Sequence, residues 1–274
     1  MRGTHITGAA ILAPLSPTEE LRPAAWVHKP ARLARMDRLC GLALVCVDAA
    51  LAHAGFDAQT VTGWSGERVA VVFGTSYGCH ATDEEFFRGL VAEGARGASP
   101  RLFAYTLPSS PLGEITIHYG ARGPALALAS GDGAGLEAVA RAVALVAEGR
   151  ADIAIAAAAE VGFASAALHD GAAAIVVERE GRRAGAAVVS RGHLIGEGAA
   201  FLDGQPSLAA LRADSIALAA TWDRVSELRA APGTPGAAAP LAALVRWLLD
   251  GKGHRALATA QDPAGSAHAL YLIR

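Results

Sequence analysis

The stretch ALALASGDGAGLEAVARAVALVAEGRADIAIAAAA, residues 125–159, carries the strongest structural signal in the chain. It begins with a short apolar run, passes through a glycine-rich turn, and continues with apolar residues at helical spacing. Gly149 is placed to end that helix, and a second apolar run follows it. The order strand, turn, helix, strand predicts a βαβ unit with both strands in one sheet.

A similar pattern recurs near the C-terminus, in GAAAPLAALVRWLLDGKGHRALATA, residues 236–260. Leu241, Leu244 and Leu248 share one face of the predicted helix, and Gly251 follows it where the first copy has Gly149. The offset between the two copies is about 102 residues. Two such units in one chain predict a duplicated α/β architecture.

The segments before residue 125 show the same alternation of elements. Residues 4–12 and 69–73 predict strands, and residues 35–54 predict an amphipathic helix. Thr82, with Glu85 three positions later, has the spacing of a capping box and predicts the start of another helix. The chain is therefore expected to fold as α/β throughout.

Composition excludes several classes of protein. The 24 Lys+Arg residues against 26 Asp+Glu are scattered along the chain, so it lacks the basic patch of a nucleic-acid-binding protein. No apolar stretch reaches about 18 uncharged residues, which argues against a membrane span, and no export signal is recognisable at the start. Three cysteines indicate neither a disulfide framework nor a metal site. We expect a cytoplasmic protein that uses no metal.

Residues 74–78, GTSYG, match G-x-S-x-G between a predicted strand and a predicted helix. This is the context of a nucleophile elbow, so Ser76 is a candidate serine nucleophile. A triad would need an acid and a histidine farther along the chain, for which the candidates are Asp170 or Asp214 with His254 or His268. The other interpretation is a tight glycine turn that closes the strand.

Residues 131–135, GDGAG, form a second glycine-rich turn, ahead of the helix in the first βαβ unit. A dinucleotide-binding fingerprint would need a further glycine where Leu136 stands, so no nucleotide cofactor is predicted. Asp132 falls at the expected N-terminus of the helix, where free N–H groups and the helix dipole stabilise an anion. We expect Asp132 to be the N-cap of this helix.

Four segments in chain order carry a family resemblance. Residues 35–55 are similar to an R-M-D-R helix, residues 68–78 to a strand followed by a G-T-G-x-G loop, residues 99–130 to a T-L-P-N and G-E-I segment, and residues 148–160 to an S-G-R-A-D strand. All four motifs belong to the β-ketoacyl-acyl-carrier-protein synthase family of the thiolase superfamily, which the chain therefore resembles. Later, residues 169–180 resemble the family's G-E-G-A-G strand.

The resemblance implies a thiolase-like fold, with layers in the order α-β-α-β-α built from duplicated βαβ halves. The chain would then be a single domain, residues 1–274. Its N-terminal half, residues 1–165, would carry the turn at the nucleophile position. Residues 166–274 would form a C-terminal half that is shortened relative to the family.

The same alignment implies that the catalytic groups of the family are missing. The nucleophilic cysteine of T-A-C-A-S aligns with Asp132, and a carboxylate cannot replace the thiolate that accepts the acyl group as a thioester. One family histidine would fall within residues 218–223 and the other at Gly233, and no histidine occurs between His193 and His254. The chain is thus not expected to be an enzyme by itself.

A family member without its catalytic groups resembles the chain length factor of type II fatty acid and polyketide systems, and most of all the inactive subunit of aryl polyene ketosynthases. Such a subunit pairs with a cysteine-bearing ketosynthase, meets acyl carrier protein indirectly, and needs no cofactor. The apolar face of the pairing strand is expected to need either self-association, as a homodimer, or a partner. By position, the interface and acyl pocket would comprise Tyr105, Thr106, Leu107, Pro108, Ser109, Leu126, Leu128 and Ser130.

Two other functions are compatible with parts of the sequence. One is a serine esterase or thioesterase that uses Ser76. The other is a decarboxylating homologue, because some relatives have glutamine in place of the nucleophile, but those relatives keep both histidines and this chain does not.

Overall fold

The computed structural model describes most of the first 180 residues of the chain and the helix and strands near its C-terminus. The described residues are 4–15, 20–21, 33–57, 64–162, 169–179, 190–191, 201–202, 205–206, 226–228, 236–250, 255–261 and 267–273. None of the helices in these ranges has the length and hydrophobicity needed to cross a bilayer.

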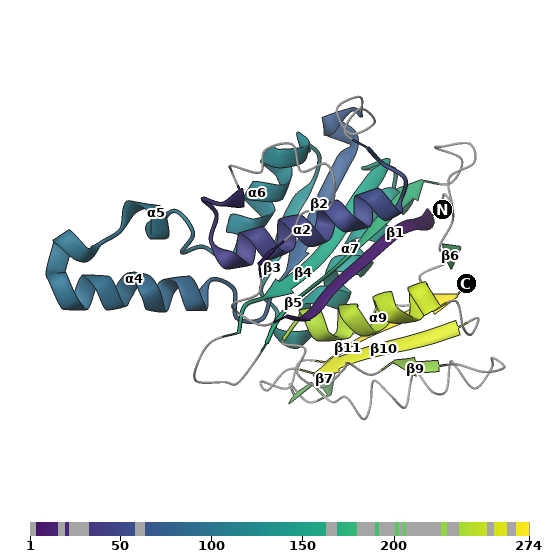
Figure 1. The fold of residues 1–274 in the computed structure, drawn as a ribbon. Coiled ribbons are helices and arrows are strands. Elements are labelled where there is room, and N and C mark those ends of the chain that lie inside the picture. The colour runs from purple at the N-terminus through teal and green to yellow at the C-terminus, as the bar shows by residue number, and fades with distance from the viewer. Residues whose placement is uncertain are drawn as a thin grey trace.

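A six-stranded mixed sheet forms the centre of the molecule (Figure 1). β2 is parallel to its neighbours β3 and β4, and β5 is antiparallel to both β4 and β1. In order across the sheet, the strands are β3 (Ala125–Leu128), β2 (Val69–Gly74), β4 (Ile153–Glu160), β5 (Asp170–Arg179), β1 (Thr4–Leu15) and β6 (Ser190–Arg191). β5 begins after the expected boundary at residue 165, so this sheet draws on both predicted halves.

Helices α2 (Arg38–His53) and α6 (Ser110–Tyr119) cover one face of this sheet. Asp37 is the N-cap of α2: one carboxylate oxygen accepts a hydrogen bond from the Cys40 amide at 3.0 Å. The other accepts from the Thr82 hydroxyl, also at 3.0 Å. The capping-box prediction for Thr82 is therefore wrong, because α4 (His80–Glu93) begins two residues earlier and the Thr82 side chain turns inward to Asp37.

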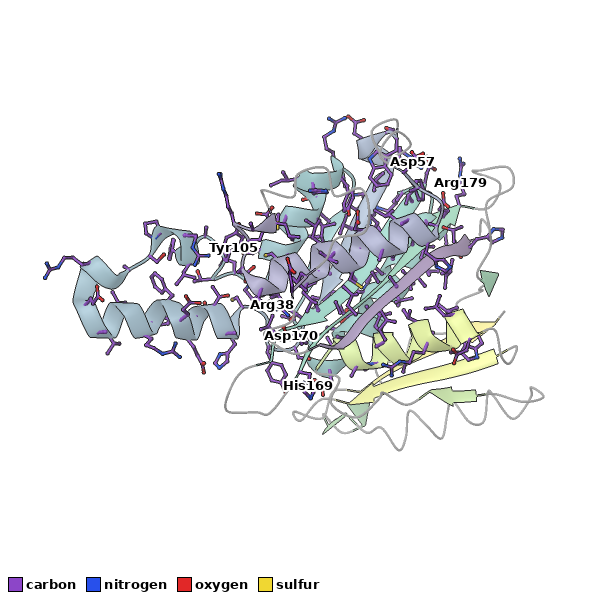
Figure 2. The ribbon with its side chains drawn as sticks, viewed as in Figure 1. Arg38, Asp57, Tyr105, His169, Asp170 and Arg179 are labelled. Atoms are coloured by element: carbon purple, nitrogen blue, oxygen red, sulfur yellow. The ribbon has the colours of Figure 1, made fainter. Side chains whose placement is uncertain are left out.

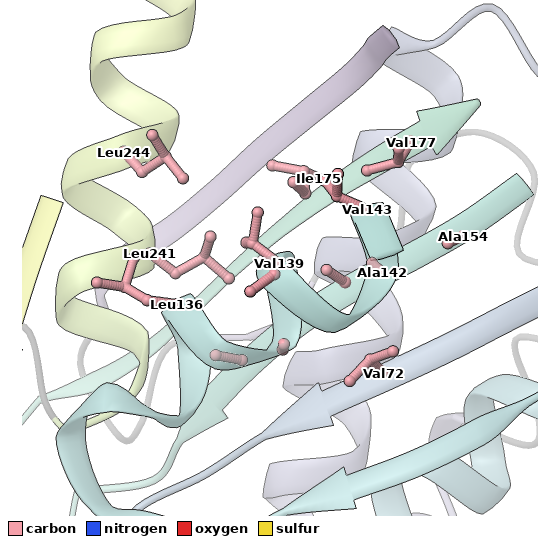
Figure 3. Packing of buried hydrophobic residues seen from close by; sticks show 14 of the residues in the cluster. Val72, Leu136, Val139, Ala142, Val143, Ala154, Ile175, Val177, Leu241 and Leu244 are labelled. Carbon is pink, nitrogen blue, oxygen red and sulfur yellow. The ribbon is translucent and has the colours of Figure 1, made fainter. Parts of the chain in front are cut away.

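Helices α7 (Ala134–Ala147) and α9 (Ala238–Asp250) cover the opposite face (Figure 3). Beyond them lies a second sheet, in which β10 is parallel to β9 and antiparallel to β11. Its strands are β9 (Ser226–Leu228), β10 (Arg255–Gln261) and β11 (Ala267–Ile273), and a separate pair consists of β7 (Phe201–Leu202) and β8 (Gln205–Pro206). The first predicted βαβ unit is present as β3–α7–β4. The helix and strand predicted within residues 236–260 are α9 and β10, and β9, which lies before that range, completes the unit β9–α9–β10. The described residues form four alternating layers, in the order α-β-α-β.

Small side chains allow the helices to pack close to both faces of the sheet. In β4 all eight residues are buried. Ile153 and Ile155 point toward α2, whereas Ala154, Ala156 and Ala158 point toward α7. A strand buried on both faces reads as a continuous apolar run, which is why the sequence predicts it without alternation.

α4 and the short α5 (Pro100–Phe103) extend from the side of the molecule as an arm (Figure 1). Thr82 is the one residue of α4 that is buried. Farther out, the ring of Phe86 contacts those of Phe87 and Phe103, at centroid distances of 5.6 and 5.8 Å. The arm is therefore held to the body mainly at its base.

Candidate functional site

The turn that contains Ser76 lies at the carboxyl end of β2. β4 is the parallel neighbour of β2, with Gly74 opposite Ala158, so Glu160 at the end of β4 reaches the same edge of the sheet. Ligand and catalytic sites in α/β folds commonly lie at this edge of a parallel sheet.

Glu160 is the centre of the site. Its side chain is fully buried, and four donors converge on the carboxylate. One oxygen accepts hydrogen bonds from the Thr75 hydroxyl at 3.0 Å, from the Ser76 amide, and from the Ala237 amide at 3.4 Å. The other accepts from the Tyr77 amide at 3.2 Å. Three chain segments thus meet at one side chain.

Burial is the dominant electrostatic effect on this carboxyl. Removal from water raises the pKa of Glu160 to about 7, although the hydrogen bonds from Ser76, Tyr77, Thr75 and Ala237 all act to lower it. The pKa of the Tyr77 phenol is raised as well. Burial is the largest cause, followed by the negative charges of Asp132 and Glu160. Glu160 is therefore shielded from solvent, and two carboxyl groups lie near the Tyr77 phenol.

Asp132 faces Ser76 across the site. The Ser76 hydroxyl donates to the Asp132 carboxylate at 2.8 Å. Asp132 lies in the 3-10 turn Gly131–Gly133, and the N-cap position of α7 is Gly133, which has no side-chain capping bond. The prediction that Asp132 caps the helix is therefore wrong. Its carboxylate instead accepts a hydrogen bond from the Ser76 hydroxyl.

The start of α9 closes the site from the second βαβ unit. Gly236 has a positive φ of 43°, and a Cβ at this position would lie 2.9 Å from the Ser76 hydroxyl and 3.0 Å from Glu160. A side chain here would displace one of them. Sequence reasoning missed Glu160, Gly236 and Ala237. A charged residue at the end of an alanine-rich buried strand was the available signal for Glu160.

The geometry around Ser76 does not match a nucleophile elbow. Its hydroxyl is bonded to an aspartate rather than to a histidine. In an elbow, the amide of the residue after the nucleophile forms part of the oxyanion hole, but here the Tyr77 amide is already bonded to Glu160. Of the proposed triad partners, Asp214 and His254 lie outside the described residues.

Asp170, another proposed triad partner, makes its hydrogen bonds with Arg38 and Gly162 and not with Ser76 (Figure 2). The Arg38 guanidinium donates to its carboxylate at 2.7 Å, and the Gly162 amide donates to the other oxygen at 2.9 Å. Asp170 is fully buried at the start of β5 and serves to join α2 to the sheet. The structure does not bring it to Ser76.

The cysteines do not supply a nucleophile either. All three are buried free thiols, and burial is the largest of the effects that raise their pKa values. That of Cys79 rises to about 12, with the Asp83 carboxylate adding to the effect of burial. A thiol that stays protonated is inert. Among the described residues, no group of His, Cys, Asp and Glu is arranged to hold a metal ion.

The residues expected at an interface lie in two segments, residues 105–109 between α5 and α6 and residues 126–130 at β3. Tyr105 is half-buried, and its hydroxyl donates to Glu114 at 3.3 Å. Leu107 is 61% exposed, and the neighbouring Pro108 and Ser109 are exposed as well. Thr106 is partly buried, with its hydroxyl bonded to the Phe103 carbonyl.

β3 is the edge strand of the six-stranded sheet in the part of the chain that the structure describes. Leu126 is 37% exposed on this strand, whereas Leu128 packs partly into the core beside α7. Ser130 donates to Glu137 at 2.7 Å, in the first turn of α7. The positions expected for the two family histidines, 218–223 and 233, fall outside the described residues.

Comparison with known proteins identifies the family. The model of the β-ketoacyl synthase N-terminal domain matches residues 7–202. The ketoacyl synthase alpha subunit of the tetracenomycin polyketide synthase of Streptomyces glaucescens is 34% identical over 134 residues, which cover 46% of this chain and 30% of that protein. A polyketide β-ketoacyl synthase 1 of Streptomyces cyaneus is 34% identical over 145 residues, covering 50% and 33% of the two chains. The match thus spans about a third of these relatives.

Solved structures share the fold over the whole chain. The ishigamide ketosynthase/chain length factor superposes with a TM-score of 0.75 at 21% identity, covering 99% of each chain. AntDE:AntF, a type II acyl-carrier protein in complex with its ketosynthase, superposes at 0.78 and 16% identity, covering 100% of this chain and 99% of that one. The expected thiolase-like fold is confirmed.

We predict that the free energy of unfolding depends on pH through the ionisation of Glu160. Its pKa in the folded protein, about 7, lies above its ordinary value of 4.5. The folded state therefore binds this proton more tightly than the unfolded state, so the contribution of Glu160 to stability is present below pH 4.5 and is lost as the pH rises through 7. Urea unfolding at several pH values should show wild type losing stability relative to Glu160→Gln between pH 5 and 8. The same change in free energy of unfolding with pH in wild type and in Glu160→Gln would contradict this prediction.

We also predict that Ser76 is unreactive toward a fluorophosphonate probe, because its hydroxyl is bonded to Asp132 and the Tyr77 amide is already bonded to Glu160. Labelling of the wild type should not exceed that of Ser76→Ala, as measured by mass spectrometry of the intact protein. Labelling that is lost in Ser76→Ala would favour the esterase or thioesterase interpretation.

Proposed function

Because the chain belongs to the β-ketoacyl synthase family, we propose that it acts as a non-catalytic, chain-length-factor-like subunit. It would pair with an active ketosynthase in a type II fatty acid or polyketide pathway of the aryl polyene kind. It would meet acyl carrier protein through that partner, and it would work in the cytoplasm without a cofactor.

The observation that carries the proposal is the contact between Asp132 and Ser76. By its place in the chain, Asp132 occupies the position of the family's nucleophilic cysteine, and its carboxylate accepts the Ser76 hydroxyl at 2.8 Å. A carboxylate that took the acyl group would form a labile anhydride, and its charge would repel an anionic malonyl group. Condensation needs a polarisable thiolate at this point.

The other groups near the site add no acid–base chemistry of the required kind. The three cysteines are buried with raised pKa values, and the sequence has no histidine from residue 194 to residue 253. Glu160 is committed to four hydrogen bonds within the protein. We infer that the chain supports a reaction that takes place in its partner.

The surface favours a partner of the same fold. The outer edge of β3 has no strand beside it among the described residues, and Ala125, Leu126 and Ala127 expose apolar side chains without a charge between them. Strand edges of this kind are prone to pair with another chain. Leu107 and Pro108, in the segment that packs against Gly78, are exposed apolar residues as well. Self-association of this chain through the same surface, as a homodimer, is the alternative to pairing with the ketosynthase.

We predict a one-to-one complex when the chain is co-expressed with a cysteine-bearing ketosynthase of its own genome, measured by light scattering after size exclusion. Leu107→Asp combined with Leu126→Asp should abolish the complex, because both changes place a charge on the proposed apolar interface. Val91→Asp is the matched control, since Val91 is 84% exposed on α4, outside the proposed interface. A chain that stays monomeric with every ketosynthase tested would contradict the proposal.

We predict that Asp132→Ala leaves condensation by the complex largely intact. The change removes the hydrogen bond to Ser76 and should lower the free energy of unfolding by about 1 kcal/mol. Product formation from acyl and malonyl carrier protein, measured on purified complex, should stay within about twofold of wild type, because a residue outside the reaction does not alter its barrier. Loss of condensation in an intact complex would show that Asp132 takes part in the chemistry.

A further inference from the structure

Glu160 has no role in the proposed function, and yet it makes more polar contacts than any other carboxylate of the site. Its side chain is completely shielded from solvent, and no cation is among the contacts that the structure gives it. A buried carboxylate without a cation is costly unless hydrogen bonds compensate for the lost water. Here three backbone amides and one hydroxyl take the place of water.

The donors come from two segments that are far apart in sequence. Thr75, Ser76 and Tyr77 form the turn after β2, whereas Ala237 immediately precedes α9. The turn is closed further by Thr75, whose hydroxyl donates to Glu160 and accepts from the Gly78 amide at 2.9 Å. Ala237 brings the N-terminal end of a 13-residue helix, whose dipole also favours a negative charge at this point.

The turn also packs against a third segment, residues 105–109, at Gly78. This glycine has a φ of 58°, and a Cβ on it would lie 3.2 Å from the side chain of Pro108. The turn that Glu160 holds is therefore packed directly against the 105–109 segment. Any shift of the turn would be transmitted to that surface.

We propose that Glu160 is a positioning residue whose carboxylate acts as an internal anionic ligand. It holds the turn at 75–78 and the start of α9 together, and through the contact of Gly78 with Pro108 it sets the position of the 105–109 segment. Asp132, which accepts one hydrogen bond from the turn, is secondary to it.

The first test removes the Glu160 carboxylate by substitution and supplies a small carboxylate from solution in its place. Glu160→Ala leaves four donors around a cavity of about the size of a small carboxylate, so formate should bind there. At pH 8, above the pKa of about 7 at which Glu160 ionises in the folded protein, we expect Glu160→Ala to have a lowered melting temperature. Millimolar sodium formate should raise it in a saturable way, whereas equal sodium chloride should not. Wild type and Glu178→Ala are the controls, because Glu178 is also buried but lies at the other end of the sheet, opposite Ile153.

Equal stabilisation of all three proteins by formate would overturn the proposal, because it would reflect a general salt effect. Stabilisation confined to Glu160→Ala would support it. A role in packing alone predicts no difference between formate and chloride, so the comparison separates an anionic ligand from a side chain that merely fills space.

The second test keeps the volume of the side chain and therefore does not depend on the stability of the alanine variant. In Glu160→Gln the oxygen should remain at the position that accepts from Thr75, Ser76 and Ala237, which places the amide nitrogen opposite the Tyr77 amide. Two donors then face each other. Hydrogen exchange of the Tyr77 amide should accelerate about tenfold or more, because a bond to a charged acceptor is lost.

Exchange in Glu160→Gln should also rise at residues 105–109. It should stay at the wild-type rate in α2, which supplies none of the four hydrogen bonds to Glu160. Unchanged exchange at both Tyr77 and residues 105–109 would overturn the proposal. A uniform increase over the whole chain would do so as well, since it would indicate a loss of global stability rather than the release of one turn.

Discussion

The contacts that close the site around Ser76 depend on the burial of one carboxylate at the end of a central strand. Because β2 and β4 are parallel neighbours, the turn after β2 and the last residue of β4 must meet at the same edge of the sheet. The Glu160 carboxylate at this edge is shielded from water, so it needs hydrogen-bond donors from the protein. The turn and the start of α9 supply them, and the need to satisfy Glu160 thus fixes the arrangement of both segments.

The small side chains of the sheet make this convergence possible. Ala154, Ala156 and Ala158 present little bulk to α7, so the two inner helices can lie close to the strands and to each other. Leu136 and Leu241 then fill the space between the helices (Figure 3). The starts of α7 and α9 consequently face one small volume, in which Asp132 and Glu160 are the acidic groups. Each negative charge lies near the favourable end of a helix dipole.

The sequence predicted the elements well where local signals and tertiary packing agree. The strand at 69–73 and the helix that begins near residue 134 are both buried along an apolar run or stripe, and the structure confirms them. Thr82 and Asp132 were misassigned because capping patterns are local, whereas their partners, Asp37 and Ser76, come from other elements. Nothing near Glu160 in the sequence indicates that the start of a helix 77 residues away will donate to it.

The distribution of contacts makes the position of the turn independent of the residue at position 132. Ser76 is held through its backbone amide by Glu160, and its hydroxyl alone depends on Asp132. The residue at position 132 can therefore change without release of the turn, because the interactions that position the turn do not pass through it. In the proposed non-catalytic role, an acid at this position would face the N-terminal end of α7, where the helix dipole stabilises a negative charge.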